Sequence, residues 1–317
     1  MKKNILVTGG AGFLGSHLCN ELINSNFNVT CLDNLFTGKI ENLKHLENYK
    51  EFKFIKHDVT EYKDIECDYI FHLACPASPI QYQKDPVKTV STNVEGTLNM
   101  LKLANTRKIP ILFTSTSEVY GDPEVSPQKE SYWGRVNPVG PRSCYDEGKR
   151  VGETLSYSYF EHFGVHTNCI RPFNIYGPGM LQTDYRVLPN FALNILNKKP
   201  LRVSHPGTQT RTYCYATDAI IGFFLVFLKG RPGEIYNIGN NKPEVTVFDL
   251  AKMVKKDINN EIKIKIMKYP KDYPDEEPER RCPDLNKSKK HLGYSPKVKL
   301  EDGLIKFFNW SFDNYKI

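Results

Sequence analysis

The sequence predicts the α/β class, with a doubly wound parallel sheet and a smaller C-terminal α/β part. In the first half of the chain, short apolar runs alternate with helical stretches, and after Arg171 proline and glycine become frequent. Strands that alternate with helices form βαβ units, whose parallel strands are covered on both faces. A length of 317 residues suits one large domain with a smaller companion.

The expected strands of the main sheet are short and largely apolar, as buried parallel strands are. They cover residues 3–7, 28–33, 52–57, 69–73, 111–114 and 167–171. Helices are expected over residues 16–25, 85–106 and 145–163, and in the second of these the apolar residues recur near one helical face.

The part after Arg171 has a different texture, with polar loops between helical pieces at residues 188–196 and 247–256. A strand-like run at residues 234–238 is expected to return to the main sheet. We therefore expect a first domain of residues 1–173 with about 211–240, and a second of residues 174–210 and 241–317.

Composition excludes several classes of protein. The apolar fraction of 40% is ordinary for a soluble globular chain, no apolar run reaches the roughly 18 residues of a membrane span, and the N-terminus lacks a signal-peptide pattern. We expect a cytoplasmic protein that does not bind membranes. The net charge of +7 is spread along the chain, so no nucleic-acid partner is expected. The cysteines form no CxxC pair, and no metal site is expected.

A glycine-rich segment follows the first expected strand. Gly9, Gly12 and Gly15 have GxxGxxG spacing and open the first helix, with Phe13 and Leu14 between the last two glycines. Glycines here permit a tight turn and close approach of the backbone to a pyrophosphate, while free N–H groups at the helix start bind phosphates. This motif in this setting predicts a Rossmann-type dinucleotide site.

The ends of the next strands supply the remaining expected contacts to the dinucleotide. Asp33 ends the second strand, where a carboxylate can accept hydrogen bonds from both ribose hydroxyls and repel a 2′-phosphate. The sequence therefore predicts NAD rather than NADP. Further cofactor contacts are expected at the same edge of the sheet, from Asn34, Asp58, Val59, Leu73 and Ala74.

A Tyr-xxx-Lys pair, Tyr145 and Lys149, puts both side chains on one face of an expected helix. A free phenol titrates near pH 10, but a neighbouring ammonium and an oxidised nicotinamide lower its pKa, so that it can take a proton from a sugar hydroxyl. Both residues are also expected to contact the cofactor. Thr116 can hydrogen-bond the hydroxyl being oxidised, and Glu118 places a carboxylate at the mouth of the site.

The sequence carries the motifs GGAGFLG, LDN, HLACPASP, STSEVYGDPE, NPVGPRSCYDEGKR, RPFNIYGP and TQTR. In these it resembles the UDP-glucuronate decarboxylases, also called UDP-xylose synthases, of the extended short-chain dehydrogenase/reductase superfamily. The resemblance extends from about residue 3 to about residue 300 and is densest between Ala74 and Arg150.

The pair Ser117-Glu118 separates the relatives within this superfamily. The 4,6-dehydratases carry Asp-Glu at these positions, and the 4-epimerases usually carry small or hydroxyl residues in place of Glu118. The pair therefore favours a decarboxylase. A 4-epimerase, 4,6-dehydratase or C4 oxidoreductase acting on another nucleotide sugar is the alternative. A non-catalytic NAD-binding protein is a further one, but it would have no need of Thr116, Tyr145 and Lys149.

The resemblance implies that UDP-glucuronate is decarboxylated to UDP-xylose through a 4-keto intermediate, with the hydride returned internally from the NAD. It implies that Glu118 supports the chemistry at C5, that Arg281 is the counter-charge of the anionic substrate, and that the first domain binds NAD and the second the nucleotide sugar. It also implies a homodimer packed through the helices near residues 85–106 and 145–163. The other implied substrate contacts are Ser117, Asn174, Arg186, Asn190 and Arg211.

Overall fold

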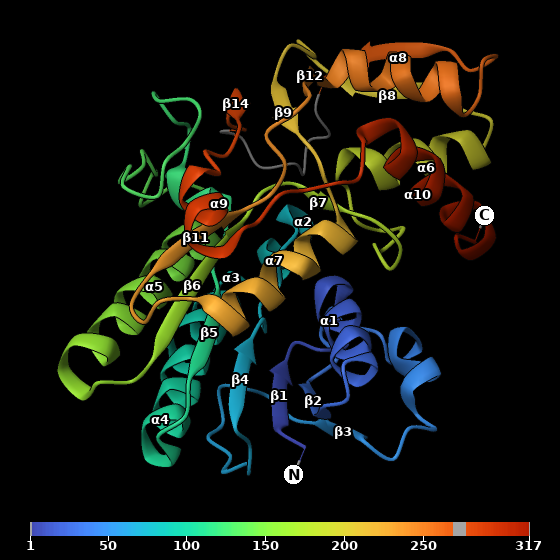
Figure 1. Cartoon of the computed structure of the whole chain (residues 1–317). Helices are drawn as coiled ribbons and strands as arrows, with labels where there is room; N and C mark the ends of the chain where they lie inside the picture. Colours follow the sequence, from blue (N-terminus) through green and yellow to red (C-terminus); the bar gives the residue numbers. More distant parts are fainter. Residues whose placement is uncertain (1, 269–276, 317) are drawn as a thin grey trace.

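The computed structural model describes residues 2–268 and 277–316. Its centre is a seven-stranded sheet in the order β11-β6-β5-β4-β1-β2-β3, and every neighbouring pair is parallel (Figure 1). The order reverses between β1 and β4, which is the crevice where open α/β sheets bind ligands. The strands are β1 (Asn4–Thr8), β2 (Asn28–Asp33), β3 (Phe52–Lys56), β4 (Tyr69–His72), β5 (Ile111–Thr114), β6 (Thr167–Pro172) and β11 (Ile235–Ile238).

Helices cover both faces of this sheet, so the predicted fold class is confirmed. One face carries α1 (Phe13–Asn24), α7 (Ala216–Lys229) and α9 (Asn286–Leu292), and the other carries α3 (Pro86–Ser91), α4 (Thr97–Arg107) and α5 (Ser143–Phe163). All residues of β4 and β5 are buried, as strands between two helical layers must be. The predicted return of residues 234–238 to the sheet is confirmed by β11.

The single helix predicted over residues 85–106 is wrong. A π-helical turn, η2 (Thr92–Gly96), separates α3 from α4, and a short helix α2 (Pro79–Lys84) precedes them. Thr92 and Asn93 in this turn hydrogen-bond back to the carbonyls of Lys88 and Thr89, at 2.8 and 3.0 Å. Such side-chain bonds to the preceding turn disturb regular helix geometry.

A second core lies beyond the carboxyl ends of the strands. It is built on α6 (Val187–Leu196), α8 (Val247–Asp257), α10 (Leu300–Asn314) and the parallel pair β8 (Leu201–Ser204) and β13 (Ile264–Met267), at the upper right of Figure 1. The helices predicted at residues 188–196 and 247–256 are confirmed by α6 and α8. The sequence did not predict α7 or α10.

Two small sheets lie between the two cores. β9 (Thr210–Thr212) pairs with β12 (Glu244–Thr246) and with β14 (Arg280–Arg281), while β7 (Ile175–Tyr176) pairs with β10 (Cys214–Tyr215). Two 3-10 turns, η1 (Ile40–Leu46) and η3 (Ser117–Tyr120), complete the elements.

The segment around α9 departs from the predicted second domain of residues 174–210 and 241–317. Leu285, Leu292 and Tyr294 belong to the same hydrophobic cluster as β1 and α7, so this stretch packs on the main sheet. Helix α9 contacts both α7 and β11. In the described part of the chain, no helix is long and apolar enough to cross a membrane.

Candidate active site

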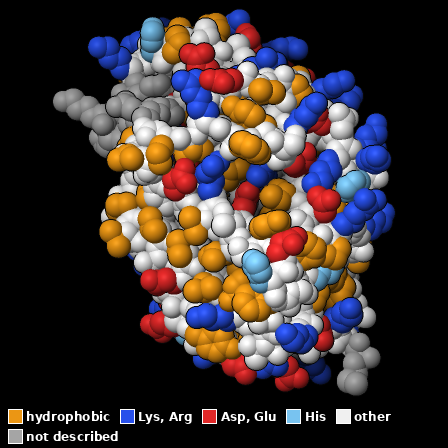
Figure 2. Space-filling view, turned by 90° about the vertical axis from the view of Figure 1, so that its left-hand side faces the viewer, with side chains coloured by type: hydrophobic (Ala, Val, Ile, Leu, Met, Phe, Trp, Pro, Cys, Tyr) orange, Lys and Arg blue, Asp and Glu red, His pale blue; other side chains and the backbone are white. Residues whose placement is uncertain are grey.

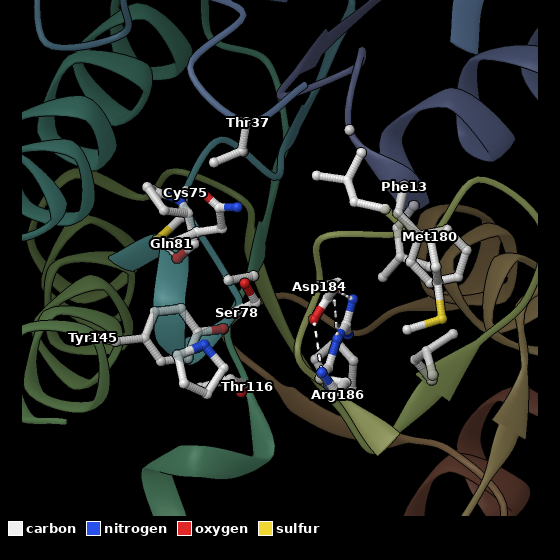
Figure 3. A pocket seen from close by; sticks show the side chains of 18 of the residues that line it. Phe13, Thr37, Cys75, Ser78, Gln81, Thr116, Tyr145, Met180, Asp184 and Arg186 are labelled. Atoms are coloured by element: carbon white, nitrogen blue, oxygen red, sulfur yellow. Dashed lines mark hydrogen bonds and ion pairs between the residues drawn. The ribbon is translucent and has the colours of Figure 1, made fainter. Parts of the chain in front are cut away.

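A pocket lies between the carboxyl ends of the parallel strands and the second core, lined by residues from both (Figure 3). The structure brings all but one of the predicted site residues to this pocket, and the exception is Asp58. Those that line it are Gly9, Gly12, Phe13, Leu14, Gly15, Asp33, Asn34, Val59, Leu73, Ala74, Thr116, Ser117, Glu118, Tyr145, Lys149, Asn174, Arg186, Asn190, Arg211 and Arg281.

The glycine turn between β1 and α1 has the shape that a dinucleotide needs. Gly9 has φ +71°, and a Cβ there would lie 2.7 Å from the Ala74 nitrogen. A Cβ on Gly15 would collide with the Gly9 carbonyl oxygen, whereas one on Gly12 would meet only that oxygen, at 3.2 Å. Gly9 therefore turns the chain close to β4, Gly15 lets α1 pack closely on that turn, and Gly12 leaves the approach to the helix N-terminus open.

Backbone hydrogen bonds fix the Asp33 carboxylate at the end of β2. Its Oδ2 accepts from the Ala11 N–H at 3.0 Å and its Oδ1 from the Leu35 N–H at 2.8 Å. Burial raises the pKa of the Asp33 carboxyl, and these two backbone N–H groups oppose that rise. A carboxylate fixed in this way beside the glycine turn fits the ribose of NAD.

Asp58 lies outside the pocket lining, in the layer behind it. It accepts from the Asn34 side chain at 2.9 Å and pairs with Lys88 at 2.8 Å. Burial would raise the pKa of Asp58, but the bonds from Lys88, Thr60 and Asn34 bring it below its usual range. In this structure Asp58 fixes Asn34, a pocket residue, rather than facing the pocket itself.

Tyr145 and Lys149 project from α5 beneath the ends of β4 and β5. Lys149 is buried and donates to the Thr114 carbonyl at 2.8 Å, and burial lowers its pKa. Its ammonium lies 6.0 Å from the centre of the Tyr145 ring. The lowering of the Tyr145 pKa by a neighbouring ammonium together with an oxidised nicotinamide stays a prediction for the site with NAD bound. Burial raises that pKa, and a hydrogen bond with Thr116 only partly opposes the rise.

Thr116 and Tyr145 lie together on one side of the pocket (Figure 3). The Thr116 hydroxyl also accepts from the Glu118 N–H at 3.2 Å and so caps the start of η3. Behind Tyr145, the ring of Tyr82 stacks at 5.0 Å with planes 5° apart. Sequence reasoning missed Tyr82, because nothing in its local pattern marks it as a support for a residue on α5.

A buried network of charges surrounds Glu118. Its carboxylate oxygens accept hydrogen bonds from both terminal nitrogens of Arg281, at 2.5 and 2.6 Å, and from Arg142 at 3.0 Å. Arg142 also pairs with Glu277 at 2.9 Å, and Glu277 pairs with Arg211 at 2.7 Å. Burial alone would raise the pKa of Glu118, but Arg281 and Arg142 lower it to about 2.

This network determines what Arg281, the predicted counter-charge of the substrate, contacts in the structure. Arg281 lines the pocket as predicted, but its guanidinium is engaged by Glu118 rather than open to the cavity. Sequence reasoning missed Arg142 and Glu277 as pocket residues. Arg142 stands within the motif NPVGPRSCYDEGKR, which was the available signal, whereas the proline-rich surroundings of Glu277 gave none.

The remaining predicted substrate contacts lie on the other side of the pocket. Arg186 donates through Nε to Asp184 at 2.8 Å, and this pair faces the cavity in Figure 3. The Asn190 side chain donates a hydrogen bond to the Tyr185 carbonyl at 3.3 Å. The Asn174 side chain donates to the Thr212 carbonyl at 2.9 Å, and Asn174 itself has φ +43°. Within the described residues, no cluster of His, Cys, Asp and Glu is arranged to hold a metal ion.

Residues 5–239 match the model of the NAD dependent epimerase/dehydratase family. The chain belongs to this family. It is 52% identical over 301 residues to UDP-glucuronic acid decarboxylase 3 of Arabidopsis thaliana. The alignment covers 95% of this chain and 86% of that protein. It is 45% identical over 309 residues to UDP-glucuronic acid decarboxylase 1 of Xenopus tropicalis, covering 98% of this chain and 72% of that one.

Among solved structures of this family, the chain is similar to UDP-glucuronic acid 4-epimerase from Bacillus cereus in complex with UDP-glucuronic acid and NAD. The TM-score is 0.86 and the identity 31%, over 98% of this chain and all (100%) of that one. The family's description and the fit of the glycine turn and Asp33 confirm the predicted cofactor, NAD.

Proposed function

We propose that this member of the NAD dependent epimerase/dehydratase family decarboxylates UDP-glucuronate to UDP-xylose. One observation of the site carries the proposal: Tyr145, Thr116 and Lys149 share a pocket with a glutamate that two arginines hold, Glu118. A tyrosine oxidation site beside such a charge cluster suits a substrate with its own carboxylate. The relatives named UDP-glucuronic acid decarboxylase support the same reading.

Bound NAD would supply a hydride acceptor that later returns the hydride, held by the glycine turn and by Asp33. We assign the proton of the sugar C4 hydroxyl to Tyr145, with the Thr116 hydroxyl orienting the group. Lys149 places a cation beneath the Tyr145 ring and favours the phenolate once the site is filled. A C4 ketone makes the C5 carboxylate a β-keto acid, which loses carbon dioxide readily.

We assign the anionic ends of the substrate to the arginines of the pocket. Arg281 is the proposed partner of the carboxylate, because a guanidinium binds a carboxylate through two parallel hydrogen bonds, as it already binds Glu118. Arg186, Asn190 and Asn174, which all line the pocket, are assigned to the nucleotide end, and Ser117 to the sugar. The first part of the chain would then bind NAD and the second the nucleotide sugar.

We also propose a homodimer in which α3 and α5 pack against the same helices of a second copy. The support is apolar exposure on these two helices. Val87 is 75% exposed and Tyr157 60%, and Val90, Val151 and Phe163 are exposed too. Hydrophobic side chains gather on the face that α5 crosses (Figure 2). A patch of this kind is typical of a protein interface.

The test is incubation of the purified protein with UDP-glucuronate and NAD, followed by mass spectrometry of the nucleotide sugar. We expect a UDP-pentose formed by loss of carbon dioxide in the wild type, and none with Tyr145→Phe. Unchanged substrate would contradict UDP-glucuronate as the substrate, while NAD binding measured by calorimetry would still report on the cofactor site.

The second candidate is epimerisation at C4, favoured by the structural similarity to the UDP-glucuronic acid 4-epimerase of Bacillus cereus. That reaction keeps the carboxylate, so its product has the mass of the substrate. Chromatography that separates C4 epimers, applied to the same incubation, decides between the two. A product of unchanged mass with a new retention time would establish the epimerase.

A further inference from the structure

Ser78 presents a buried hydroxyl to the pocket that no assigned role uses. The residue is 6% exposed and lines the pocket. Among the described residues, its Oγ has no hydrogen-bond partner. Buried hydroxyls are nearly always hydrogen-bonded, because burial without a partner is unfavourable. A hydroxyl of this kind that faces a cavity indicates a ligand group that bonds to it.

The hydroxyl does not serve the local structure either. Ser78 is the N-cap of α2, a position where a serine side chain usually accepts from an N–H of the first helical turn. Here the Ser78 carbonyl accepts instead, from the N–H groups of Gln81 at 2.9 Å and Tyr82 at 3.0 Å. Asp85, the N-cap of the following helix, does use its side chain, which accepts from the Lys88 N–H at 2.9 Å. The Ser78 hydroxyl itself, rather than the start of this short helix, is available to a ligand.

Helix α2 turns Ser78 toward the proposed base, Tyr145. Ser78 and Tyr82 are four residues apart and so lie on one face of the helix. The Tyr82 ring on that face stacks on Tyr145, with ring centres 5.0 Å apart. Figure 3 shows the Ser78 side chain directed into the same cavity as Tyr145 and Thr116. Ser78 therefore faces the part of the pocket in which the oxidised carbon of the substrate would lie.

The substrate group that Ser78 would meet follows from the roles already assigned. Tyr145 and Thr116 are assigned to the C4 hydroxyl, and Arg281 to the carboxylate on C5. The other neighbour of C4 is C3, and no residue has been assigned specifically to its hydroxyl. A sugar hydroxyl both donates and accepts hydrogen bonds, as a serine hydroxyl does. The C3 hydroxyl is therefore the group that matches Ser78 in chemistry and in place.

We propose that Ser78 is a specificity residue that binds the C3 hydroxyl of the sugar and so orients C4 toward the NAD; the inference rests on the proposed oxidation at C4. With the carboxylate held on one side of C4 and the C3 hydroxyl on the other, the C4–H bond keeps one orientation toward the hydride acceptor. The site then favours sugars with a hydroxyl at C3, because an analogue without it leaves the Ser78 hydroxyl buried and unbonded.

The test is a cycle of two proteins and two substrates, measured as kcat/KM. The substrates are UDP-glucuronate and its 3-deoxy analogue, and the proteins are the wild type and Ser78→Ala. We expect either change alone to lower kcat/KM about tenfold, as the loss of one hydrogen bond does. The two changes together should lower it no more than about tenfold, since they remove the same bond. A combined loss of about 100-fold, or no loss in Ser78→Ala, would overturn the proposal.

Ser126→Ala is the matched control. Ser126 also precedes a proline, and its buried Oγ also has no partner within the described part of the chain, but it does not line the pocket. This variant should keep the wild-type kcat/KM with both substrates. Without ligands, Ser78→Ala should have an unchanged or higher Tm, because it removes an unbonded buried hydroxyl. A Tm several degrees lower would show a structural role and contradict the assignment.

Calorimetry reads the same cycle without turnover, as the Kd of each nucleotide sugar in the Tyr145→Phe background with NAD present. Losses of about tenfold that do not add are again expected. The affinity for NAD should not change in Ser78→Ala, and a fall of about tenfold would assign the hydroxyl to the cofactor and refute the proposal. A non-additive affinity cycle without decarboxylation would refute the proposed function alone, whereas additive losses with decarboxylation would refute the role of Ser78 alone.

Discussion

Replacing Arg171 with methionine should destabilise the fold strongly, because it leaves a buried carboxylate without its cation. Arg171 on β6 reaches Glu153 on α5 with two hydrogen bonds, at 2.8 and 2.6 Å. The two side chains are only 9% and 11% exposed. Arg171 also donates to the Tyr120 hydroxyl at 2.8 Å. In Arg171→Met, Ser115 would be left as the side-chain donor to Glu153.

The expected loss of folding stability follows from the burial of this ion pair. Removing one partner of a buried ion pair typically costs about 3–5 kcal/mol. In a chain of this size, about 1 kcal/mol corresponds to about 2 °C in Tm, so Arg171→Met should lower Tm by about 6–10 °C. Arg107→Met is the matched control. It breaks a pair in which two Arg107 nitrogens donate to one oxygen of Asp64, but Asp64 is 61% exposed, so the loss of stability should stay below about 1 kcal/mol.

The assay is thermal unfolding followed by circular dichroism, at one protein concentration and without added cofactor. The double variant Arg171→Met with Glu153→Leu should recover much of the loss, since it removes the stranded charge as well. A fall in Tm no larger than that of Arg107→Met would refute the reasoning. So would a double variant whose loss equals the sum of the two single losses.

Three further outcomes are expected. Asp33→Asn should weaken NAD binding at least about tenfold and reduce the preference over NADP, measured by calorimetry with both cofactors, because a charge-assisted hydrogen bond is worth about 1.5–3 kcal/mol. Tyr145→Phe should lower kcat by about 10²–10⁴ with Tm unchanged, whereas Tyr62→Phe, at an exposed position, should alter neither. The folded-state pKa of Glu118, about 2, lies below its unfolded value of about 4.3, so its contribution to stability is present above about pH 4.3 and lost as the pH falls toward about 2. Urea midpoints should therefore fall less steeply with acidification in Glu118→Gln than in the wild type.

The main sheet could be predicted because its signals are local. Each buried strand is a short apolar run, and the glycine turn after β1 places its motif between a strand and a helix. Helix α7 was missed because apolar residues such as Ile221 and Leu228 also stand on its exposed side, so its sequence is a nearly continuous apolar run rather than a clear alternation of apolar and polar faces. The break at η2 was missed because it coincides with a distant contact, where Gly96 packs against Val59 with no room for a Cβ.

The candidate site was predictable to the extent that its residues belong to motifs. The glycines, Asp33, Thr116, Tyr145 and Lys149 all occupy defined places at strand ends or on α5, and the fold brings them to one pocket. The prediction that Asp58 contacts the cofactor placed it in the pocket because it follows a strand. The end of a strand predicts where a residue lies but not which way its side chain points. The Asp58 side chain turns to Lys88, a partner contributed by a helix about thirty residues away that no local pattern links to it.

The charge network shows why residue type alone could not predict which carboxylates the arginines pair with. Arg281 was assigned to an anionic substrate, yet its partner in the structure is Glu118, which lies far away in the sequence and was itself assigned to catalysis. Arg142, Arg211 and Arg281 are balanced by Glu118 and Glu277, three positive charges against two negative. One added carboxylate would make the set neutral. Under the proposed assignment of Arg281, a substrate carboxylate exchanges with Glu118, and its affinity reflects the difference between two guanidinium–carboxylate pairs rather than the full strength of one.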